Sequence, residues 1–341
     1  MKRYFKLSEV QSAALKMTVL CLGGFFAATA GPTIGVASAA ASSVQLAPFK
    51  DDLYAIHPYD GILRRCDAAI NERTLKLPSM KGRHVIYAFD EKTDVNGRDV
   101  PMANGQWQNV AKPKYISLLN ERDQRTFDLK IETASGSRVL QNNEVGNPNG
   151  AKFAIIFIHG AAGIYANRDL GTQDVSFSGN FNRLKNMVVE NGGVYYTPSI
   201  SDFEVKGPQD VTQLIEHIGR VSPGAPIVLS CASSGGAVCA GVAKSPKAAK
   251  LLSGIILIGS SWNMSFIGSP AHEARVPVVF AQGTCDRGNP YDRLFGLFRE
   301  ILKRDDSYPT RFQGFADGVH GTPVRMMNWR DTLNWIFSIE R

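Results

Sequence analysis

After residue 150 the chain alternates between short apolar runs and segments with helical periodicity, and this alternation limits the possible folds. The apolar runs are 153–158, 194–196, 227–229, 254–258, 276–280 and 310–315. Short strands that are apolar on both faces and separated by helices predict an α/β fold, with a mostly parallel central sheet and helices on both faces. In such sheets, ligands bind outside the carboxyl ends of the strands.

The helices between these runs are predicted from apolar spacing and from their first turns. We expect helices around 177–188, 208–218, 234–243, 291–298 and 322–336. Pro208, Pro290 and Pro323 each precede or open one of them, and proline suits the first turn because the amide hydrogen that it lacks is unpaired there. The last segment is expected to be one terminal helix.

Before residue 150 the apolar residues come in shorter runs that are broken by turn signals. Residues 84–89 and 127–131 are predicted to be strands of a hairpin or meander. The resulting domain organisation has three parts. A signal peptide occupies 1–39, an N-terminal extension with the first strands of the sheet spans 40–150, and the α/β core spans 151–341.

The N-terminus has the three regions of a secretory signal peptide. Basic residues precede an apolar run over 17–30, and Ala37-Ser38-Ala39 has the small-x-small form of a cleavage site. The sequence therefore predicts an exported protein, periplasmic or secreted, whose mature chain begins near Ala40 and keeps no stable transmembrane anchor. The alternative is an N-terminal membrane anchor, for which the apolar run is short.

Charge and motifs argue against several classes of partner. Without residues 1–39 the formal charge falls from +7 to +4, because four basic residues and Glu9 are removed. This modest excess, without a clustered basic stripe, does not indicate nucleic-acid binding. The chain lacks a His-Glu-x-x-His motif, a phosphate-binding lysine loop and a dinucleotide glycine pattern, so neither a metal nor another cofactor is expected.

The cysteines that remain after cleavage are Cys66, Cys231, Cys239 and Cys285. Export permits disulfides, but these spacings match neither a small disulfide scaffold nor a zinc site. For Cys231 and Cys239 we expect buried free thiols.

The segment 228–236 runs from an apolar strand directly into a small-residue helix, with a serine at the junction. A nucleophile at such a turn is held in a strained conformation above the sheet, near the positive end of the following helix. This segment resembles the nucleophile elbow of the α/β-hydrolase family, which is usually Gly-x-Ser-x-Gly. The resemblance covers Ala151 to the C-terminus and implies that Ser233 is the nucleophile.

One departure from the family pattern keeps a second register open. Cys231 stands where the family has its first glycine, and a shift of one residue makes Ser234 the candidate, flanked by Ala232 and Gly236. We prefer Ser233, because the glycine pair then follows it at the positions that are usual in the family.

A serine nucleophile needs a base and an orienting carboxylate. His320 lies in a loop of small residues after the last strand, and Asp286 lies just beyond the strand over 276–280. Both loops leave the sheet at its carboxyl end, and the order serine, aspartate, histidine is the chain order of the family. Asp317 is a competitor for the carboxylate because it is close to His320 in sequence.

The resemblance also implies an oxyanion hole of two backbone N–H groups. One belongs to Ser234, and the other is expected at Ala161 in the small-residue loop after the first core strand. His159 in that loop is interpreted as a structural residue. Tyr165 and Trp262 are candidates for the substrate pocket.

These residues predict an exported serine hydrolase that cleaves carboxylic esters, either small-molecule or lipid esters, through an acyl-enzyme on Ser233. A peptidase or amidase with the same triad is the alternative within enzymes. A non-catalytic binding protein of the same fold remains a separate alternative, because fold does not fix function.

Overall fold

The structure is a computed structural model of the chain. It describes residues 44–48, 64–65, 68–69, 81–87, 99–101, 107–109, 118–119, 123–161, 169–172, 179–260 and 264–340, all within one unit, Ala41–Arg341. The proposed signal peptide therefore lies outside the described residues. No helix in the described ranges is long and apolar enough to span a membrane.

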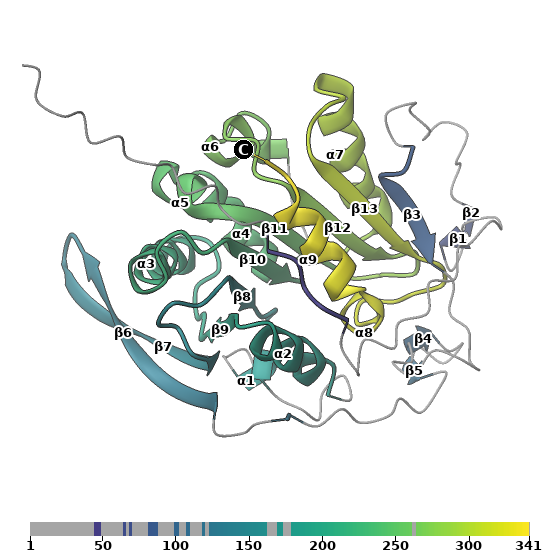
Figure 1. Cartoon of the computed structure of the whole chain (residues 1–341). Helices are drawn as coiled ribbons and strands as arrows, with labels where there is room; N and C mark the ends of the chain where they lie inside the picture. The colour runs from purple at the N-terminus through teal and green to yellow at the C-terminus, as the bar shows by residue number, and fades with distance from the viewer. Residues whose placement is uncertain are drawn as a thin grey trace, which may run out of the picture. The chain divides into compact units, whose positions relative to one another are not determined.

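One large sheet organises the described part of the chain (Figure 1). Its strands are β3 His84–Tyr87, β6 Gln124–Thr133, β7 Gly136–Gly146, β8 Ala154–Ile158, β9 Val194–Pro198, β10 Ile227–Ala232, β11 Leu252–Ile258, β12 Val278–Gly283 and β13 Thr310–Phe315. Their order is β3-β13-β12-β11-β10-β8-β9-β7-β6. All neighbours from β3 to β9 are parallel, whereas β7 is antiparallel to both β9 and β6.

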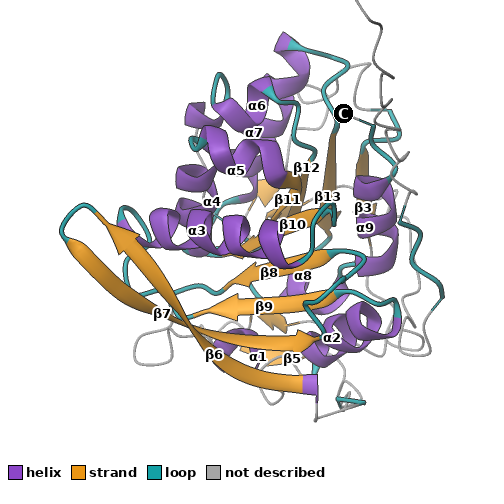
Figure 2. Cartoon of the chain, turned by 60° about the vertical axis from the view of Figure 1, so that its left-hand side comes forward, coloured by secondary structure: helices purple, strands orange, loops and turns teal. Residues whose placement is uncertain are grey.

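Helices cover both faces of this sheet (Figure 2). The helices are α1 Asp169–Thr172, α2 Asn180–Glu190, α3 Lys206–Val221, α4 Gly235–Ala243, α5 Pro246–Leu251, α6 Pro270–Glu273, α7 Tyr291–Arg304, α8 Thr322–Met326 and α9 Trp329–Phe337, with the 3-10 turn η5 Met264–Phe266. Helices α3 to α7 pack on one face and form the first core cluster with it. Helices α2, α8 and α9 pack on the other face and form the second core cluster. Short two-stranded pairs also occur, β1 Arg64–Arg65 with β2 Ala68–Ala69 and β4 Asp99–Pro101 with β5 Trp107–Asn109.

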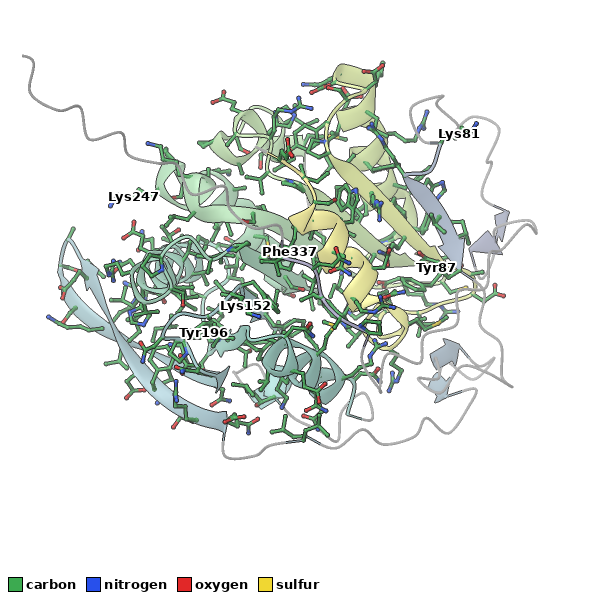
Figure 3. The ribbon with its side chains drawn as sticks, viewed as in Figure 1. Lys81, Tyr87, Lys152, Tyr196, Lys247 and Phe337 are labelled. Atoms are coloured by element: carbon green, nitrogen blue, oxygen red, sulfur yellow. A yellow bond between two sulfur atoms is a disulfide. The ribbon has the colours of Figure 1, made fainter. Side chains whose placement is uncertain are left out.

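The alternation of side chains along each strand explains why these strands are apolar throughout. In β8, Ile156 faces the first core cluster while Phe157 faces the second. Figure 3 labels Tyr196 of β9, which belongs to the first cluster, and Phe337 at the end of α9, which packs against the second. A strand that is buried on both faces has no position for a solvent-facing polar side chain.

The predicted core strands are confirmed, with shifts of a few residues at their ends. Other expectations were wrong in detail. Residues 84–89 and 127–131 do contain strands, and β6 forms a hairpin with β7 as expected. Strand β3, however, belongs to no hairpin: it lies at the opposite edge of the sheet and pairs in parallel with β13. The predicted terminal helix is two helices, α8 and α9, because the Asn328 side chain accepts a hydrogen bond from the Asp331 amide and starts a new helix.

Sequence periodicity did not reveal β7, whose residues are mostly polar. Asn142, Asn143 and Glu144 are nevertheless only 0%, 5% and 4% exposed. Each of these side chains has a partner inside the fold. The Asn142 amide donates to the Leu140 carbonyl oxygen at 2.8 Å, the Asn143 amide donates to Thr172 Oγ1 at 3.1 Å, and Glu144 pairs with Arg125. A strand that satisfies buried polar groups in this way carries no apolar pattern.

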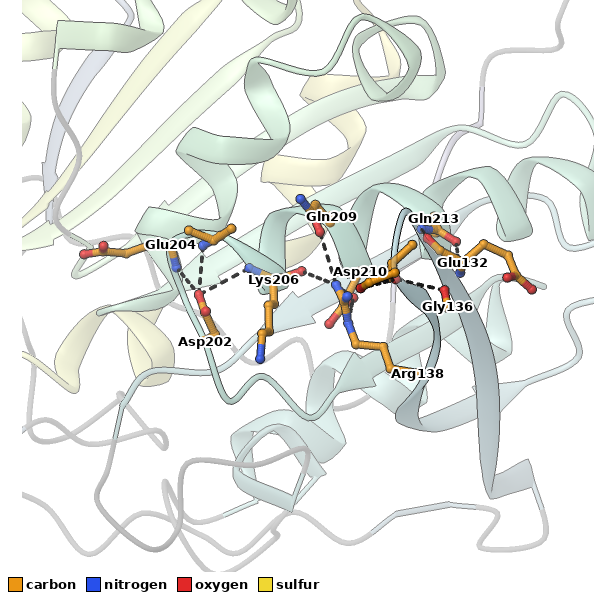
Figure 4. Close-up of polar contacts among 12 residues, drawn as sticks. Glu132, Gly136, Arg138, Asp202, Glu204, Lys206, Gln209, Asp210 and Gln213 are labelled. Atoms are coloured by element: carbon orange, nitrogen blue, oxygen red, sulfur yellow. Dashed lines mark hydrogen bonds and ion pairs between the residues drawn. The ribbon is translucent and has the colours of Figure 1, made fainter.

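The β6–β7 hairpin is fastened to α3 by side chains from both elements (Figure 4). Arg138 of β7 pairs with Asp210 of α3. The Gln213 side chain donates to the Glu132 carbonyl oxygen at 2.7 Å and accepts from the Glu132 amide at 2.9 Å. The hairpin is therefore attached to α3 as well as to β9, with which β7 pairs.

The order of the strands places a switch point between β8 and β10. From β8 the chain moves to β9 on one side, and then crosses to β10 on the other, before continuing to β11, β12 and β13. Open α/β sheets bind ligands at such a point, beyond the carboxyl ends of the strands. The loops after β8 and β10 contain the predicted oxyanion loop and Ser233.

Candidate active site

Ser233 occupies the turn between β10 and α4 in a strained backbone conformation. Its φ is +52°, in the left-handed region that non-glycine residues rarely adopt. The Ser233 amide donates to the Ile258 carbonyl at 3.1 Å, and its carbonyl accepts from the Gly236 amide at 3.0 Å. Ser234, the alternative candidate, has an ordinary φ of −59° at the start of α4. The strained junction position therefore belongs to Ser233.

Close approach of two neighbouring loops explains the small residues around this turn. A Cβ on Gly160 would lie 2.8 Å from the Ser233 Cβ, and a Cβ on Gly235 would lie 2.8 Å from the Ile158 and His159 carbonyl oxygens. Only glycine fits at either position without movement of the backbone. The loop after β8 is thus held directly against the turn after β10.

His320 and Asp286 are hydrogen-bonded to each other. The His320 Nδ1 atom lies 2.8 Å from Asp286 Oδ2. The other carboxylate oxygen accepts from the Gly288 and Asn289 amides at 2.8 and 2.9 Å, and the Gln282 side chain donates to Oδ2 at 2.8 Å. Because a carboxylate can only accept, His320 carries its proton on Nδ1 and presents Nε2 as the free basic atom.

Burial differs sharply within this pair. The Asp286 side chain is 0% exposed, whereas the His320 side chain is 40% exposed. The hydrogen bond that His320 donates to Asp286 raises the pKa of His320 above its ordinary value of 6.5, against the opposing effect of burial. Asp317, the competing carboxylate, lies in an exposed position where its amide donates to Thr284 Oγ1 at 2.8 Å. The histidine is therefore oriented by Asp286.

One cavity of about 180 Å³ brings the expected residues together. Its lining residues are Phe157, Gly160, Ala161, Phe181, Ala232, Ser233, Ile258, His320, Gly321 and Val324. Ser233, His320 and Ala161 thus border the same space, although they come from loops after three different strands. The predicted pocket residues Tyr165 and Trp262 lie outside the described residues.

His159 has a structural role that also fixes its tautomer. The Ile200 amide donates to His159 Nε2 at 3.0 Å, so this nitrogen carries no proton. Nδ1 must then be the protonated atom, and it donates to the Gly160 carbonyl oxygen at 2.9 Å. Burial lowers the pKa of His159, which favours this neutral form. The interpretation of His159 as a residue that shapes the loop agrees with these contacts.

The expectation of free thiols at Cys231 and Cys239 was wrong. The two residues form a disulfide with their Cα atoms 6.3 Å apart, and both are 0% exposed. The chain reverses between β10 and α4, which brings the end of the strand beside the second turn of the helix. The bond therefore closes a short loop that contains Ser233 and Ser234. Cys285, next to Asp286, is also disulfide-bonded.

Two residues that fix the position of Asp286 and its loop were not predicted from the sequence. Gln282 is 0% exposed and bonds Asp286, and it also donates to the Asn289 carbonyl at 2.7 Å. The Asn289 side chain donates to the Gly259 carbonyl at 2.6 Å and so ties the loop after β12 to the end of β11. A glutamine at the end of an otherwise apolar buried strand was the available signal. In the described residues, no group of three or more His, Cys, Asp or Glu side chains is arranged to hold a metal ion.

The disulfide predicts a measurable loss of stability when it is removed. Because residues 231 and 239 are separated by 8 positions, chain entropy gives the bond a contribution of about 2–3 kcal/mol. We expect the free energy of unfolding of the Cys231→Ala/Cys239→Ala double variant to be lower by this amount, so that its urea midpoint is also lower. The measurement is urea unfolding without reductant, and an unchanged midpoint with an unchanged slope would contradict the bond. Cys66 and Cys285 are unchanged in both proteins, so any difference in stability comes from the substitutions at Cys231 and Cys239.

No family model matches the chain, and no curated protein matches it in sequence. Solved structures do match its fold. A thermostable esterase superimposes with a TM-score of 0.52 and 14% identity, over 71% of this chain and 70% of its own. The acylaminoacyl peptidase of Pyrococcus horikoshii has a TM-score of 0.45 and 14% identity, over 70% of this chain and 46% of its own. Esterase Est22 has a TM-score of 0.40 and 14% identity, over 63% of this chain and 80% of its own. With its mostly parallel sheet, two helical layers and strand–turn–helix junction at Ser233, the chain has the α/β-hydrolase fold.

Proposed function

We propose that this chain is an exported serine hydrolase that cleaves carboxylic esters, with Ser233 as nucleophile, His320 as base and Asp286 as the orienting carboxylate. The observation that carries the proposal is that the hydrogen-bonded Asp286–His320 pair and the strained Ser233 meet at one cavity. A nucleophile, a base with one free nitrogen, and a buried group that fixes the tautomer are the three parts that acyl transfer to serine requires.

In the first step, Ser233 Oγ bonds to the ester carbonyl carbon while His320 Nε2 takes the hydroxyl proton. The carbonyl oxygen becomes an anion and accepts hydrogen bonds from the N–H groups of Ala161 and Ser234. Each such donor is typically worth about 3–4 kcal/mol in the transition state. Asp286 stabilises the imidazolium that forms, because its carboxylate is already bonded to the protonated Nδ1.

The intermediate then collapses to an acyl-enzyme. The carbon–oxygen bond to the alcohol breaks, and His320 gives its proton to the leaving oxygen. A water molecule next attacks the acyl carbon, with His320 again taking the proton. The carboxylic acid is released and Ser233 recovers its hydroxyl hydrogen, so no cofactor is consumed.

His159 supports the oxyanion hole through the peptide that follows it. Its Nδ1–H holds the Gly160 carbonyl oxygen. In a trans peptide the carbonyl and the next N–H point in opposite directions, so the Ala161 N–H points away from the ring. We assign His159 the role of orienting this N–H toward the substrate oxygen.

Disulfide bonding supports the export part of the proposal. The Cys231–Cys239 bond and the bonded Cys285 require an oxidising compartment to persist. Export and the cleavage site near Ala39 can be tested directly by N-terminal sequencing of the secreted or periplasmic protein.

Ser233→Ala is expected to abolish labelling by a fluorophosphonate probe and to reduce ester hydrolysis by at least about 10⁴-fold, because the acyl-enzyme cannot form. Circular dichroism should show an unchanged fold. Ser253→Ala, at the far end of β11, is the matched control. Loss of labelling in Ser234→Ala, with retention in Ser233→Ala, would transfer the nucleophile to Ser234. Absence of labelling in the native protein would favour the non-catalytic binding alternative.

Asp286→Asn is expected to lower kcat by about 10⁴-fold with little change in KM, because the histidine loses its tautomer and its counter-charge. The native rate should fall as pH decreases through the pKa of His320, which lies above 6.5, since only neutral His320 can accept the serine proton. In the variant this acid limb should move to lower pH, because the bond that raises the pKa is gone. Asp317→Asn is the control and should keep most activity with an unshifted profile.

His159→Leu keeps roughly the volume of the ring but removes both hydrogen bonds. We expect kcat to fall by about 10- to 100-fold while KM changes little, because a misdirected oxyanion donor weakens transition-state binding more than ground-state binding. His217→Leu makes the same substitution on α3, beside Phe127 and away from the cavity, and should leave both constants nearly unchanged. Equal losses in the two variants would rule out the orienting role.

A further inference from the structure

The cavity beside Ser233 extends into the second core cluster. Its inner walls are formed by Phe157 of β8, Phe181 of α2, Ile258 of β11 and Val324 of α8, all of which belong to that cluster. These four side chains are between 1% and 5% exposed. The cavity is therefore a recess in the apolar layer between the sheet and the helices α2 and α8.

Polar groups are confined to the mouth of this recess. Among the described residues that line it, the polar side chains are those of Ser233 and His320, and the backbone of Gly160, Ala161 and Gly321 lies beside them. A carbonyl carbon bonded to Ser233, with its oxygen on the Ala161 N–H, lies at this mouth. The remainder of the acyl group then points inward, against carbon atoms. The alcohol lies on the side of His320, whose side chain is 40% exposed and thus open to solvent.

Two aromatic rings form part of the inner wall of the recess. The Phe157 and Phe181 rings are 4.7 Å apart and packed edge to face. Both residues are 1% exposed, so their rings border the recess on its buried side. A chain that extends inward from Ser233 meets this apolar wall.

The volume sets the size of the group that fits. The recess holds about 180 Å³, and an apolar protein cavity of about 150 Å³ accommodates benzene. Benzene has six carbon atoms, so the recess takes a group of about six non-hydrogen atoms. Longer chains would have to displace the wall.

From these observations we infer that the recess is an acyl-binding pocket for short apolar acyl groups of up to about six non-hydrogen atoms, and that Phe181 sets the length limit. This inference rests on the proposed function and adds its substrate class. It selects short-chain carboxylic esters over long-chain lipid esters.

The test is the acyl-length profile of the native protein on para-nitrophenyl esters, which share one leaving group. From acetyl to butanoyl, kcat/KM should rise by about threefold to fourfold for each methylene buried. It should reach its maximum at butanoyl or hexanoyl and fall at least about tenfold by dodecanoyl, because overpacking a filled site is unfavourable. A second series keeps the butanoyl group and lengthens the alcohol. This series should show no such limit.

Variants of the pocket wall test the role of Phe181. Phe181→Leu shortens the wall and should move the best acyl group toward octanoyl, raising the octanoyl-to-butanoyl ratio of kcat/KM by about tenfold or more. Phe153→Leu is the matched control: it is a buried phenylalanine of the same core cluster, it does not line the recess, and it should leave the ratio unchanged. If Phe181→Leu does not fold, Val324→Ala enlarges the same recess with a smaller change and should shift the ratio in the same direction.

The outcomes separate this inference from the proposed function. If the native protein takes no fluorophosphonate label and hydrolyses no ester of the series, the proposed function fails. If it is labelled and hydrolyses acetyl esters, but dodecanoyl esters react as well as butanoyl esters, only the short acyl pocket is wrong. A length limit in the alcohol series instead of the acyl series would reassign the recess to the leaving group. Equal ratios in native, Phe181→Leu and Val324→Ala proteins would remove Phe181 as the determinant.

Discussion

The turn between β10 and α4 is the constraint on which the arrangement of the site depends. A non-glycine residue at positive φ costs on the order of 1–3 kcal/mol, so the surrounding structure must hold Ser233 there. It does so because β10 lies between β8 and β11 in the sheet, and because the Cys231–Cys239 bond joins the two arms of the turn. The glycines at 160 and 235 leave just enough room for the neighbouring loop to approach.

A buried carboxylate is the second constraint, and its surroundings explain how a charge is kept out of water. Asp286 accepts from Gln282, Gly288, Asn289 and His320, so both of its oxygens are fully satisfied. Burying an unpaired charge would be severely unfavourable, whereas four directed donors replace its hydration. The same bonds fix the loop after β12, so the position of the histidine follows from the position of the carboxylate.

Sequence alone predicted the parallel core, since strands buried on both faces leave a clear apolar signature. It also placed Ser233, Asp286 and His320 at strand ends. In the structure Ser233 and His320 line one cavity, and Asp286 is hydrogen-bonded to His320 behind it. It missed β7, where polar side chains such as Asn143 are buried by hydrogen bonds that no periodicity records. It misjudged Cys231 and Cys239, because the pairing depends on how sharply the chain reverses after β10. Nor did it indicate Phe181 as a wall, since a phenylalanine that lines a recess and one that fills a core give the same helical pattern.

The parallel topology has a further consequence for how the site comes into being. The loops that surround the recess follow β8, β10 and β13, and these strands meet only through pairing between segments distant in sequence. Contacts of this kind require closure of long loops and form slowly compared with local helices. No short segment of the chain contains all the residues that line the recess, which extend from Phe157 to Val324. The recess can therefore exist only after the sheet from β8 to β13 has assembled, so its formation is coupled to the cooperative completion of the sheet.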